Sequence, residues 1–329
     1  MNKTGWIILI VCLSLALCLC VGLLLAGRLA ASLFPASNDS PANSSVSKEY
    51  RDLRNAYSAS GVYSEKAAEL KELTIDWVSG SVVVELTDEA SIRFEETAAR
   101  PISERDALRY SINGGKLRIQ ACKKNHIGKL PLKNLVVYLP RSLANDLKEC
   151  EFDLVSASLY LDGISMHELE VNTVSGKIEA SNLTAMKAEV ETVSGDTVIR
   201  DCFFNSLRMD TVSGLMSVQG KIQKVKASSV SGSLQLFLEE SKEIRTNTMS
   251  GNVTLEFSKA PQELRVDTAS GLTSITLPQE PSCAIRLDSL SGRLLLNMEE
   301  VPSKKIILGD GEAEFDIDSV SGDVWVHVK

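Results

Sequence analysis

A four-residue motif, Thr-Val-Ser-Gly or a close variant, constrains the fold of this chain more than any other feature of the sequence. It recurs eight times after residue 169, and the segments that carry it begin 18 to 21 residues apart except for a last interval of 30. A unit this short cannot bury an apolar face alone, so the copies must stack on one another. We predict that the motif serines and glycines form the corners of the stack; they are Ser175, Gly176, Ser194, Gly195, Ser213, Gly214, Ser231, Gly232, Ser250, Gly251, Ser270, Gly271, Ser291, Gly292, Ser321 and Gly322.

Apolar residues alternate on both sides of each motif. In the fifth copy Ile244 lies before the motif, and Val253, Leu255 and Phe257 follow it. Alternation by two indicates strands with one buried face, and the phase slips by one residue at Val-Ser-Gly, which indicates a bend. We expect Gly to supply the backbone freedom of this corner and Ser to bond backbone groups at the bend. The pattern predicts an all-β fold, a β-solenoid of about ten coils of 18–21 residues with Val-Ser-Gly corners.

Two degenerate copies come earlier in the chain. One contains Val78-Ser79-Gly80 and the other Val155-Ser156-Ala157. The stretch between them is less regular, and we interpret Leu108–Ile119 and Leu135–Pro140 as strands of opening coils. The predicted solenoid domain therefore covers residues 71–329.

The N-terminal region predicts one membrane-spanning helix. Residues 5–27 contain no charged side chain, and as a helix they would span roughly 34 Å, enough for a hydrocarbon core of about 30 Å. A cleaved signal peptide, the alternative, has an apolar core of only about 7–15 residues. The predicted organisation is a short cytoplasmic tail (1–4), the transmembrane helix (5–27), a flexible linker (28–48) and a helical neck or cap (49–70). The basic residue Lys3 weakly favours an internal N-terminus, which places the repeat domain outside a single-pass cell-membrane protein.

Charge narrows the choice of partners. The formal net charge is −8, and an acidic chain without a basic block argues against nucleic-acid binding. The second position of successive repeats is mostly basic, and stacking would place these side chains in a row about 4.8 Å apart. We consider this row a candidate surface for a partner or polymer, with an ordinary solvated face as the alternative. Its basic members are Arg208, Lys226, Arg245, Arg265 and Arg286.

The sequence lacks a pattern typical of catalysis, metal binding or cofactor binding. The three histidines, His126, His167 and His327, lie far apart, and no Cys-x-x-Cys or metal-ligand spacing occurs. We therefore predict no enzyme activity and no cofactor. Outside the apolar N-terminal run, we predict that Cys150, Cys202 and Cys283 are buried and unpaired, and leave Cys122 open. If an enzyme site exists, we expect it in the longest interval, near residues 299–314.

The repeated motifs resemble those of the bacterial "putative adhesin" β-strand-repeat family. The resemblance covers about residues 70–329 and rests on Leu73–Gly80, on the repeated Thr-Val-Ser-Gly copies and on the ending Gly309–Val324. It implies a cell-envelope protein, often with one membrane helix and sometimes associated with envelope-stress systems, and it supplies no catalytic residues to transfer. The expected function is a membrane-anchored, non-enzymatic module that binds an envelope protein or polymer through its repeated surface. The alternatives are a β-helix polysaccharide-acting enzyme near residues 299–314 and self-association through the solenoid ends.

Overall fold

The computed structural model describes residues 60–65, 70–98, 101–122 and 130–329. The predicted tail (1–4), transmembrane helix (5–27), linker (28–48) and much of the neck or cap (49–70) lie outside the described residues. Within the described part, every regular element is a strand, and no helix there is long and apolar enough to cross a membrane. The described chain forms two compact units, one up to Ala185 and one from Met186 onward. We call them the first and the second unit.

The second unit contains the most regular repeats. Each has a strand before the motif and one after it, and in two places the later strand runs on into the next repeat. The strands up to residue 277 are β10 (Thr184–Thr192, which begins in the first unit), β11 (Thr197–Thr211), β12 (Leu215–Ser229), β13 (Ser233–Leu238), β14 (Glu243–Thr248), β15 (Val253–Phe257), β16 (Glu263–Thr268) and β17 (Thr273–Leu277).

Neighbouring repeats pair in parallel, with equivalent positions opposite one another. Val225 on β12 pairs with Ile244 on β14, which pairs with Leu264 on β16. In the fifth copy Ile244 and Thr246 are buried before the motif and Thr248 is buried as its first residue, while Val253 and the alternate residues that follow it are buried after the motif. The inward face therefore slips by one residue at the corner, as the sequence predicts.

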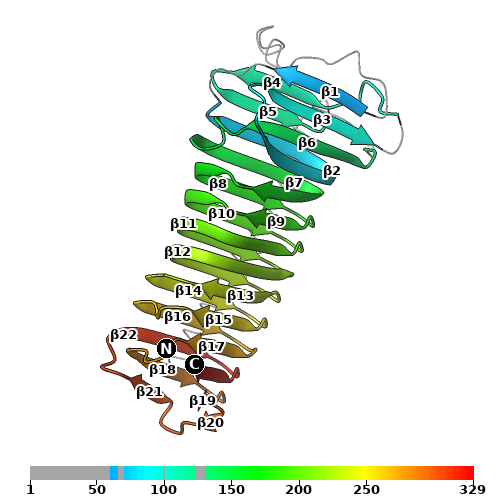
Figure 1. Ribbon diagram of the computed structural model, residues 1–329. Coiled ribbons are helices and arrows are strands. Elements are labelled where there is room, and N and C mark those ends of the chain that lie inside the picture. The colour runs from blue at the N-terminus through cyan, green and yellow to red at the C-terminus, as the bar shows by residue number, and fades with distance from the viewer. Residues whose placement is uncertain (1–59, 66–69, 99–100, 123–129) are drawn as a thin grey trace, which may run out of the picture. The chain divides into compact units, whose positions relative to one another are not determined.

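The last repeat is not the outermost one. β22 (Ala313–Ser319) lies in parallel between β16 and β18 (Cys283–Ser289), as Figure 1 shows. In the same way β23 (Val324–Val328) lies between β17 and β19 (Leu294–Leu296). The strand order in the stack therefore departs from the order in the sequence, which corrects the expectation of successive stacking.

The interval of 30 residues is an excursion rather than one long coil. After β19 the chain forms β20 (Glu299–Glu300), antiparallel to β19, and β21 (Lys305–Leu308), antiparallel to β18. It then returns as β22 into the space beside β16. Phe315 and Val324 of the inserted repeat are fully buried, because strands cover them on both sides.

The first unit contains a longer excursion. Its central pair is β2 (Glu72–Thr87) and β7 (Leu147–Asp162), which are parallel, with β8 (Ser165–Thr173) and β9 (Ile178–Ser181) also parallel to β7. β5 (Lys116–Gln120) and β6 (Lys133–Pro140) are likewise parallel to β2. Antiparallel pairs complete it: β3 (Ile92–Ala98) with β6, β1 (Ser60–Glu65) with β3, and β4 (Arg109–Asn113) with β5.

Two expectations about this region need correction. The irregular stretch between the degenerate copies contains antiparallel strands as well as parallel ones, so it is not a run of simple opening coils. Residues 60–65 lie inside the segment expected as a helical neck or cap, but they form strand β1. All six of these residues pair with β3.

Candidate functional site

Seven of the eight corner glycines, all except Gly195, are seen to lie against the backbone of the adjoining repeat. A Cβ added at Gly214 would lie 2.7 Å from the carbonyl oxygen of Gly195, and at Gly251 it would overlap the carbonyl oxygen of Gly232. Of the motif glycines only Gly214 and Gly271 have a positive φ, 112° and 114°. The expected reason for glycine, backbone freedom, therefore applies at these two corners, while close approach between repeats applies at all seven of these corners.

The motif serine bonds to the preceding repeat rather than to its own bend. The backbone N–H of Ser231 donates to the carbonyl oxygen of Val212 at 2.9 Å, and the Ser231 hydroxyl donates to the same oxygen at 3.1 Å. Ser250 repeats the arrangement on Val230, at 3.0 and 3.3 Å. The expected partner at the bend was wrong for these serines, because the closely approaching carbonyl of the adjoining repeat is the nearer acceptor.

The first motif residue closes the bend, a role that the sequence analysis missed. Ser229 is buried, and its Oγ accepts a hydrogen bond from the Gly232 N–H at 2.7 Å. Thr192 does the same for Gly195 at 2.9 Å. The signal was present, since every full copy has Thr or Ser there, in phase with the buried apolar positions: Thr173, Thr192, Thr211, Ser229, Thr248, Thr268, Ser289 and Ser319.

The outward side of the strands before the motif is highly charged in the second unit. We call it the charged face, and it consists of two rows of residues that pair across the strands. One row is Arg208, Lys226, Arg245, Arg265, Asp316 and Arg286; the other is Asp210, Ser228, Asn247, Asp267, Asp318 and Asp288. Because β22 is inserted, Asp316 lies between Arg265 and Arg286, and the basic row of the sequence is interrupted.

Carboxylates accompany the candidate arginines on this face. Arg208 lies 2.6 Å from Asp210, and Arg286 lies 2.9 Å from Asp316. Arg245 contacts Glu243 and Glu263 at 3.0 and 3.3 Å, and Arg265 contacts Asp267 and Asp318 at 3.3 and 3.4 Å. The charge of Asp267 raises the pKa of Arg265, and Lys226 is exposed. The charged face therefore largely compensates its own charge.

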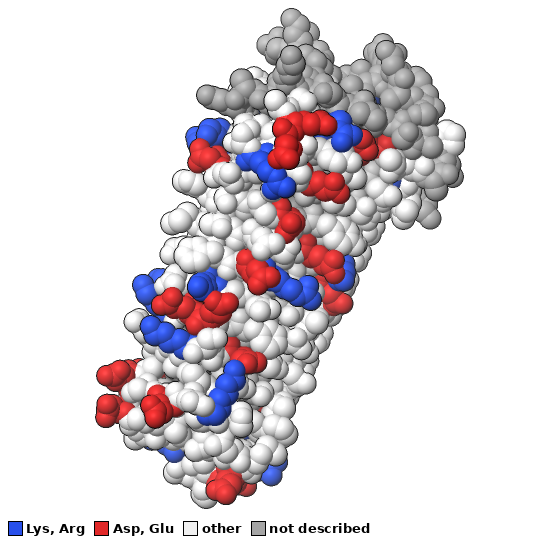
Figure 2. Space-filling model, in the orientation of Figure 1, with Lys and Arg blue, Asp and Glu red and all other residues white. Residues whose placement is uncertain are grey.

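The outward side of the strands after the motif is different. We call it the neutral face, and it also consists of two rows that pair across β12, β13, β15, β17, β23 and, for the first row, β19. The rows are Ser217, Gln235, Thr254, Ser274, Trp325 and Leu295, and Gln219, Phe237, Glu256, Thr276 and His327. Its one carboxylate, Glu256, forms an ion pair with Lys329 at 2.7 Å. In Figure 2 the flank over β13, β15 and β17 is largely white, whereas charged side chains gather over the flank with β12, β14 and β16.

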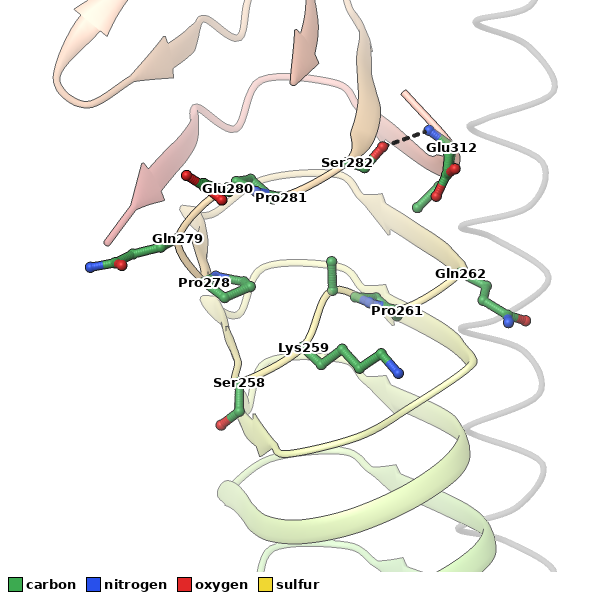
Figure 3. Close-up of a pocket in the computed structure, with 12 residues that line it drawn as sticks. Ser258, Lys259, Pro261, Gln262, Pro278, Gln279, Glu280, Pro281, Ser282 and Glu312 are labelled. Carbon is green, nitrogen blue, oxygen red and sulfur yellow. Dashed lines mark hydrogen bonds between the residues drawn. The ribbon is translucent and has the colours of Figure 1, made fainter. Parts of the chain in front are cut away.

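A hollow of about 730 Å³ lies where the inserted repeat disturbs the loops of the second unit (Figure 3). The loop from β17 to β18 has to pass the level of β22, which separates these repeats on the stack. Pro261, Pro281 and Ala313 are buried at this hollow. The backbone N–H of Glu312 donates to Ser282 Oγ at 3.3 Å.

Acidic groups do not converge in this hollow. Figure 3 shows Glu280 on the side opposite Glu312, so the two carboxylates do not face one reacting bond as a glycosidase pair would. Of the segment 299–314, where an enzyme site was expected as an alternative, only Glu312 and Ala313 border it. Among the described residues, no group of three His, Cys, Asp or Glu side chains could hold a metal ion.

The four cysteines of the described chain are buried thiols. Cys150, Cys202 and Cys283 are at most 2% exposed, and Cys122 is also buried. The predicted burial of the first three is confirmed. Burial raises the pKa of Cys150 and Cys202 to about 12 and that of Cys283 to about 11, so these thiols stay protonated and unreactive at neutral pH.

The first unit contains a buried ion pair that no sequence pattern suggested. Lys133 and Glu96 are each 2% exposed, and Lys133 Nζ lies 2.6 Å from Glu96 Oε1. The same ammonium donates to the carbonyl oxygens of Asp106, at 2.6 Å, and Ala121, and lies 5.0 Å from the centre of the Trp77 ring. The other Glu96 oxygen accepts from the Leu108 N–H at 3.2 Å. Both charged groups of the pair therefore have several hydrogen-bonding partners, and the pair connects β3, β6 and the residues next to β4 and β5.

The comparison with protein families decides the assignment. The sequence profile described as Toastrack DUF4097 matches residues 70–327, which is most of the chain. This chain belongs to the Toastrack DUF4097 family. The predicted resemblance to "putative adhesin" β-strand-repeat proteins is confirmed by this match. The family description names a fold and no reaction.

Solved structures are similar to this Toastrack chain over most of their length, at low identity. One is described as a putative lipid binding protein from Parabacteroides distasonis: it is 16% identical, with 82% of this chain and 96% of that chain covered and a TM-score of 0.46. Two are described as putative adhesins. The one from Parabacteroides merdae is 9% identical (82% and 96% covered, TM-score 0.45), and the one from Bacteroides fragilis is 11% identical (81% and 96%, TM-score 0.39). Among curated proteins no sequence matches.

Proposed function

We propose that this Toastrack chain is a membrane-anchored, non-enzymatic module of the cell envelope that binds a partner or polymer through its repeated surface. The observation that carries the proposal is the neutral face, where side chains at equivalent positions of adjoining repeats stand in rows. Neighbouring strands are about 4.8 Å apart, so such rows offer outward side chains at a regular spacing along one direction. An enzyme instead needs different groups that converge at one place.

The basic residues of the charged face are a second proposal for the contact surface. Arg208, Arg245, Arg265 and Arg286 are all within ion-pair distance of carboxylates of the same chain. A charged ligand would have to displace these carboxylates, and exposed ion pairs of this kind contribute little in either direction. This argument favours the neutral face over the charged face.

The proposed anchor is the uncharged segment 5–27, with residues 1–4 inside, 28–48 as a linker and the repeat domain of residues 71–329 outside the cell membrane. A single cysteine introduced at Ser44 tests this topology with a membrane-impermeant maleimide on intact cells. We expect labelling before lysis. Protection of that site until lysis would reverse the topology, and the unsubstituted chain is the control because its described cysteines are buried.

Binding is tested with the full chain in detergent and with washed envelope fragments. We expect saturable co-sedimentation, and heat-denatured protein is the control for trapping in the pellet. Absence of co-sedimentation with envelopes from the source cells would contradict the proposed function. A reaction product from any envelope polymer in the same mixture would favour the enzyme alternative.

A further inference from the structure

We propose that the neutral face binds a strand of an uncharged polysaccharide, with Trp325 and Phe237 as stacking platforms and the hydroxyl and amide side chains between them as hydrogen-bonding partners. The inference rests on the proposed function and names the class of polymer that this surface recognises.

The two faces differ sharply in charge although both are outward sides of strands in the same repeats. On the charged face, ten of the twelve positions in the two rows are Asp, Lys or Arg. On the neutral face, Glu256 is the one acidic or basic side chain apart from His327, and Lys329 pairs with it. Solubility alone would favour charges on both faces. An anionic or cationic polymer would find few opposite charges on the neutral face, so a neutral polymer fits it better.

The polar groups of the neutral face suit sugar hydroxyls. Ser217, Thr254, Ser274 and Thr276 each offer a hydroxyl, and Gln235 offers an amide. These groups both donate and accept hydrogen bonds, as sugar hydroxyls do, so they can pair in either direction. They stand in rows with the repeat spacing of the strands, about 4.8 Å. A ladder of this kind offers a linear chain hydroxyl and amide partners at a regular spacing.

The rings of Trp325 and Phe237 supply apolar area on this polar surface. Trp325 is 38% exposed and lies between Ser274 and Leu295 in its row. Phe237 is half-buried and lies between Gln219 and Glu256. Three strand spacings separate the strand of Phe237, β13, from the strand of Trp325, β23, which is about 14 Å along the stack. Flat rings can pack on the C–H side of a sugar ring, and they do so with little loss of side-chain freedom.

A protein partner fits the same face less well. The centre of a stable protein interface is mostly apolar and closely packed. Here hydroxyl and amide side chains occupy most of the positions between the two rings. The neutral face therefore has isolated apolar platforms in a polar ladder, rather than a continuous apolar centre.

The test is affinity electrophoresis of the full chain in detergent, in gels that contain dextran, xylan or mannan as neutral probes. Polygalacturonate is the anionic probe and chitosan the cationic one. We expect at least one neutral probe to retard the chain, with little change between about 0.05 and 0.5 M salt because no charge pairing is involved. Trp325→Ala and Phe237→Ala should each weaken retardation by roughly tenfold or more.

Phe203→Ala is the matched control, since Phe203 is 52% exposed in the same unit but outside the rows of the neutral face. It should bind like the unsubstituted chain, and circular dichroism checks that all three variants are folded. Gln235→Glu is a second variant that leaves both rings in place. It should weaken binding, because the Gln235 amide is one of the proposed hydrogen-bonding partners of the sugar hydroxyls. Unchanged retardation in both ring variants, retardation by a charged probe alone, or no retardation by any neutral probe would overturn the inference.

The same variants in envelope co-sedimentation separate the two proposals. If the ring variants bind envelopes as well as the unsubstituted chain does, the polysaccharide inference fails and the proposed function stands. If protease treatment of the envelopes abolishes binding while removal of glycans does not, the partner is a protein and the inference fails. Absence of binding by the unsubstituted chain contradicts the proposed function itself.

Discussion

Both units contain a segment that leaves the stack of parallel strands and returns, and the two segments differ in what they build. In the first unit, residues 88–146 leave after β2, pair in parallel with β2 on the way as β5 and β6, and come back as β7, which also pairs with β2. In the second unit, residues 297–312 leave after β19 and come back as β22, which pairs with β16 and β18. In each case the returning strand is parallel to its neighbours, and antiparallel strands are formed on the way.

The packing of the two excursions is not alike. The long one encloses aromatic side chains and the buried pair of Lys133 and Glu96. The short one adds β20 and β21 along existing strand edges, borders a hollow, and leaves Met298 and Ile307 exposed by 72% and 60%. About sixty residues can bury an interior of their own, whereas about sixteen can only cover an edge. The length of an excursion therefore decides whether it buries an interior of its own or only covers a strand edge.

The largest effect should come from removing residues 313–329, which deletes β22 and β23. β16 and β18 would lose their shared partner, and the buried side chains of Phe315, Ile317 and Val324 would leave a gap in the stack. We expect loss of the cooperative unfolding transition of the second unit in thermal melts by circular dichroism. Removal of Lys329 alone is the control and should have little effect, because it ends an exposed ion pair and one backbone hydrogen bond, to the carbonyl oxygen of Leu277, at the end of the chain. An unchanged transition after the larger deletion would mean that the inserted repeat is not part of the stack.

Lys133→Met tests the interior of the long excursion. The substitution leaves the Glu96 carboxylate buried without its cation, and breaking a buried pair in this way costs about 3–5 kcal/mol. Urea unfolding measures the change. The contrast is Arg245→Met, which removes two exposed ion pairs, with Glu243 and Glu263, and should cost about 1 kcal/mol or less. Equal costs would show that the buried pair has no special role in the first unit.

The corners should respond alike in both units, whatever the excursions do. Gly176→Ala in the first unit and Gly251→Ala in the second each drive a methyl group into a carbonyl oxygen of the adjoining repeat. Neither glycine has a positive φ, so the cost comes from close approach and should be about 1–3 kcal/mol. Lys226→Ala, at an exposed position, should stay within about 0.5 kcal/mol in the same urea melts. A glycine variant as mild as this control would refute the close-approach explanation.

The smallest expected effect concerns an acidic cluster of the first unit. Burial, together with the charges of Asp76 and Glu170, raises the pKa of Asp153. The folded state therefore holds this proton to higher pH than the unfolded state, and stability falls as pH rises from about 4 through the raised pKa. Asp153→Asn removes the charge and keeps an oxygen for the Asn172 amide, 3.0 Å away.

We expect Asp153→Asn to raise the melting temperature at pH 7 and to leave it nearly unchanged at pH 3, where the carboxyl is protonated in both states. Asp88→Asn is the control, because the Asp88 side chain is 95% exposed. A variant that melts lower at pH 7 would mean that the carboxylate stabilises the first unit.

The periodic part of the fold could be predicted from the sequence. In each repeat the alternating apolar residues indicate the two strands, and the Val-Ser-Gly motif indicates the corner between them. Val225, Ile244 and Leu264 have equivalent places in their copies, and they pair in the structure. The order of the copies could not be predicted, since similar strands are interchangeable partners and Phe315 suits the level between Leu264 and Ile285 as well as an outer one. The long interval before the last copy was the only sign of the change in order.

The sequence predicted that a row of outward side chains would form the candidate surface, but it did not indicate the neutral face. The basic row stood out because charge is easy to read from a sequence. The neutral face was overlooked because Ser, Thr and Gln have no distinctive pattern, and Trp325 lies in the copy whose position in the stack was unknown. The Lys133–Glu96 pair joins residues 37 apart through an irregular segment, so no local pattern could indicate it.

The inserted repeat also sets the timing of folding during synthesis. β18 and β19 leave the ribosome before β22 and β23, yet they can join the stack only through these later strands. Until residues 313–328 emerge, β18 and β19 lack their parallel partners and each has an unpaired edge. A growing chain with unpaired strand edges is prone to wrong pairing or to association with another chain. The second unit should therefore complete its folding late and in one step, which makes it sensitive to the speed of translation and to premature stops.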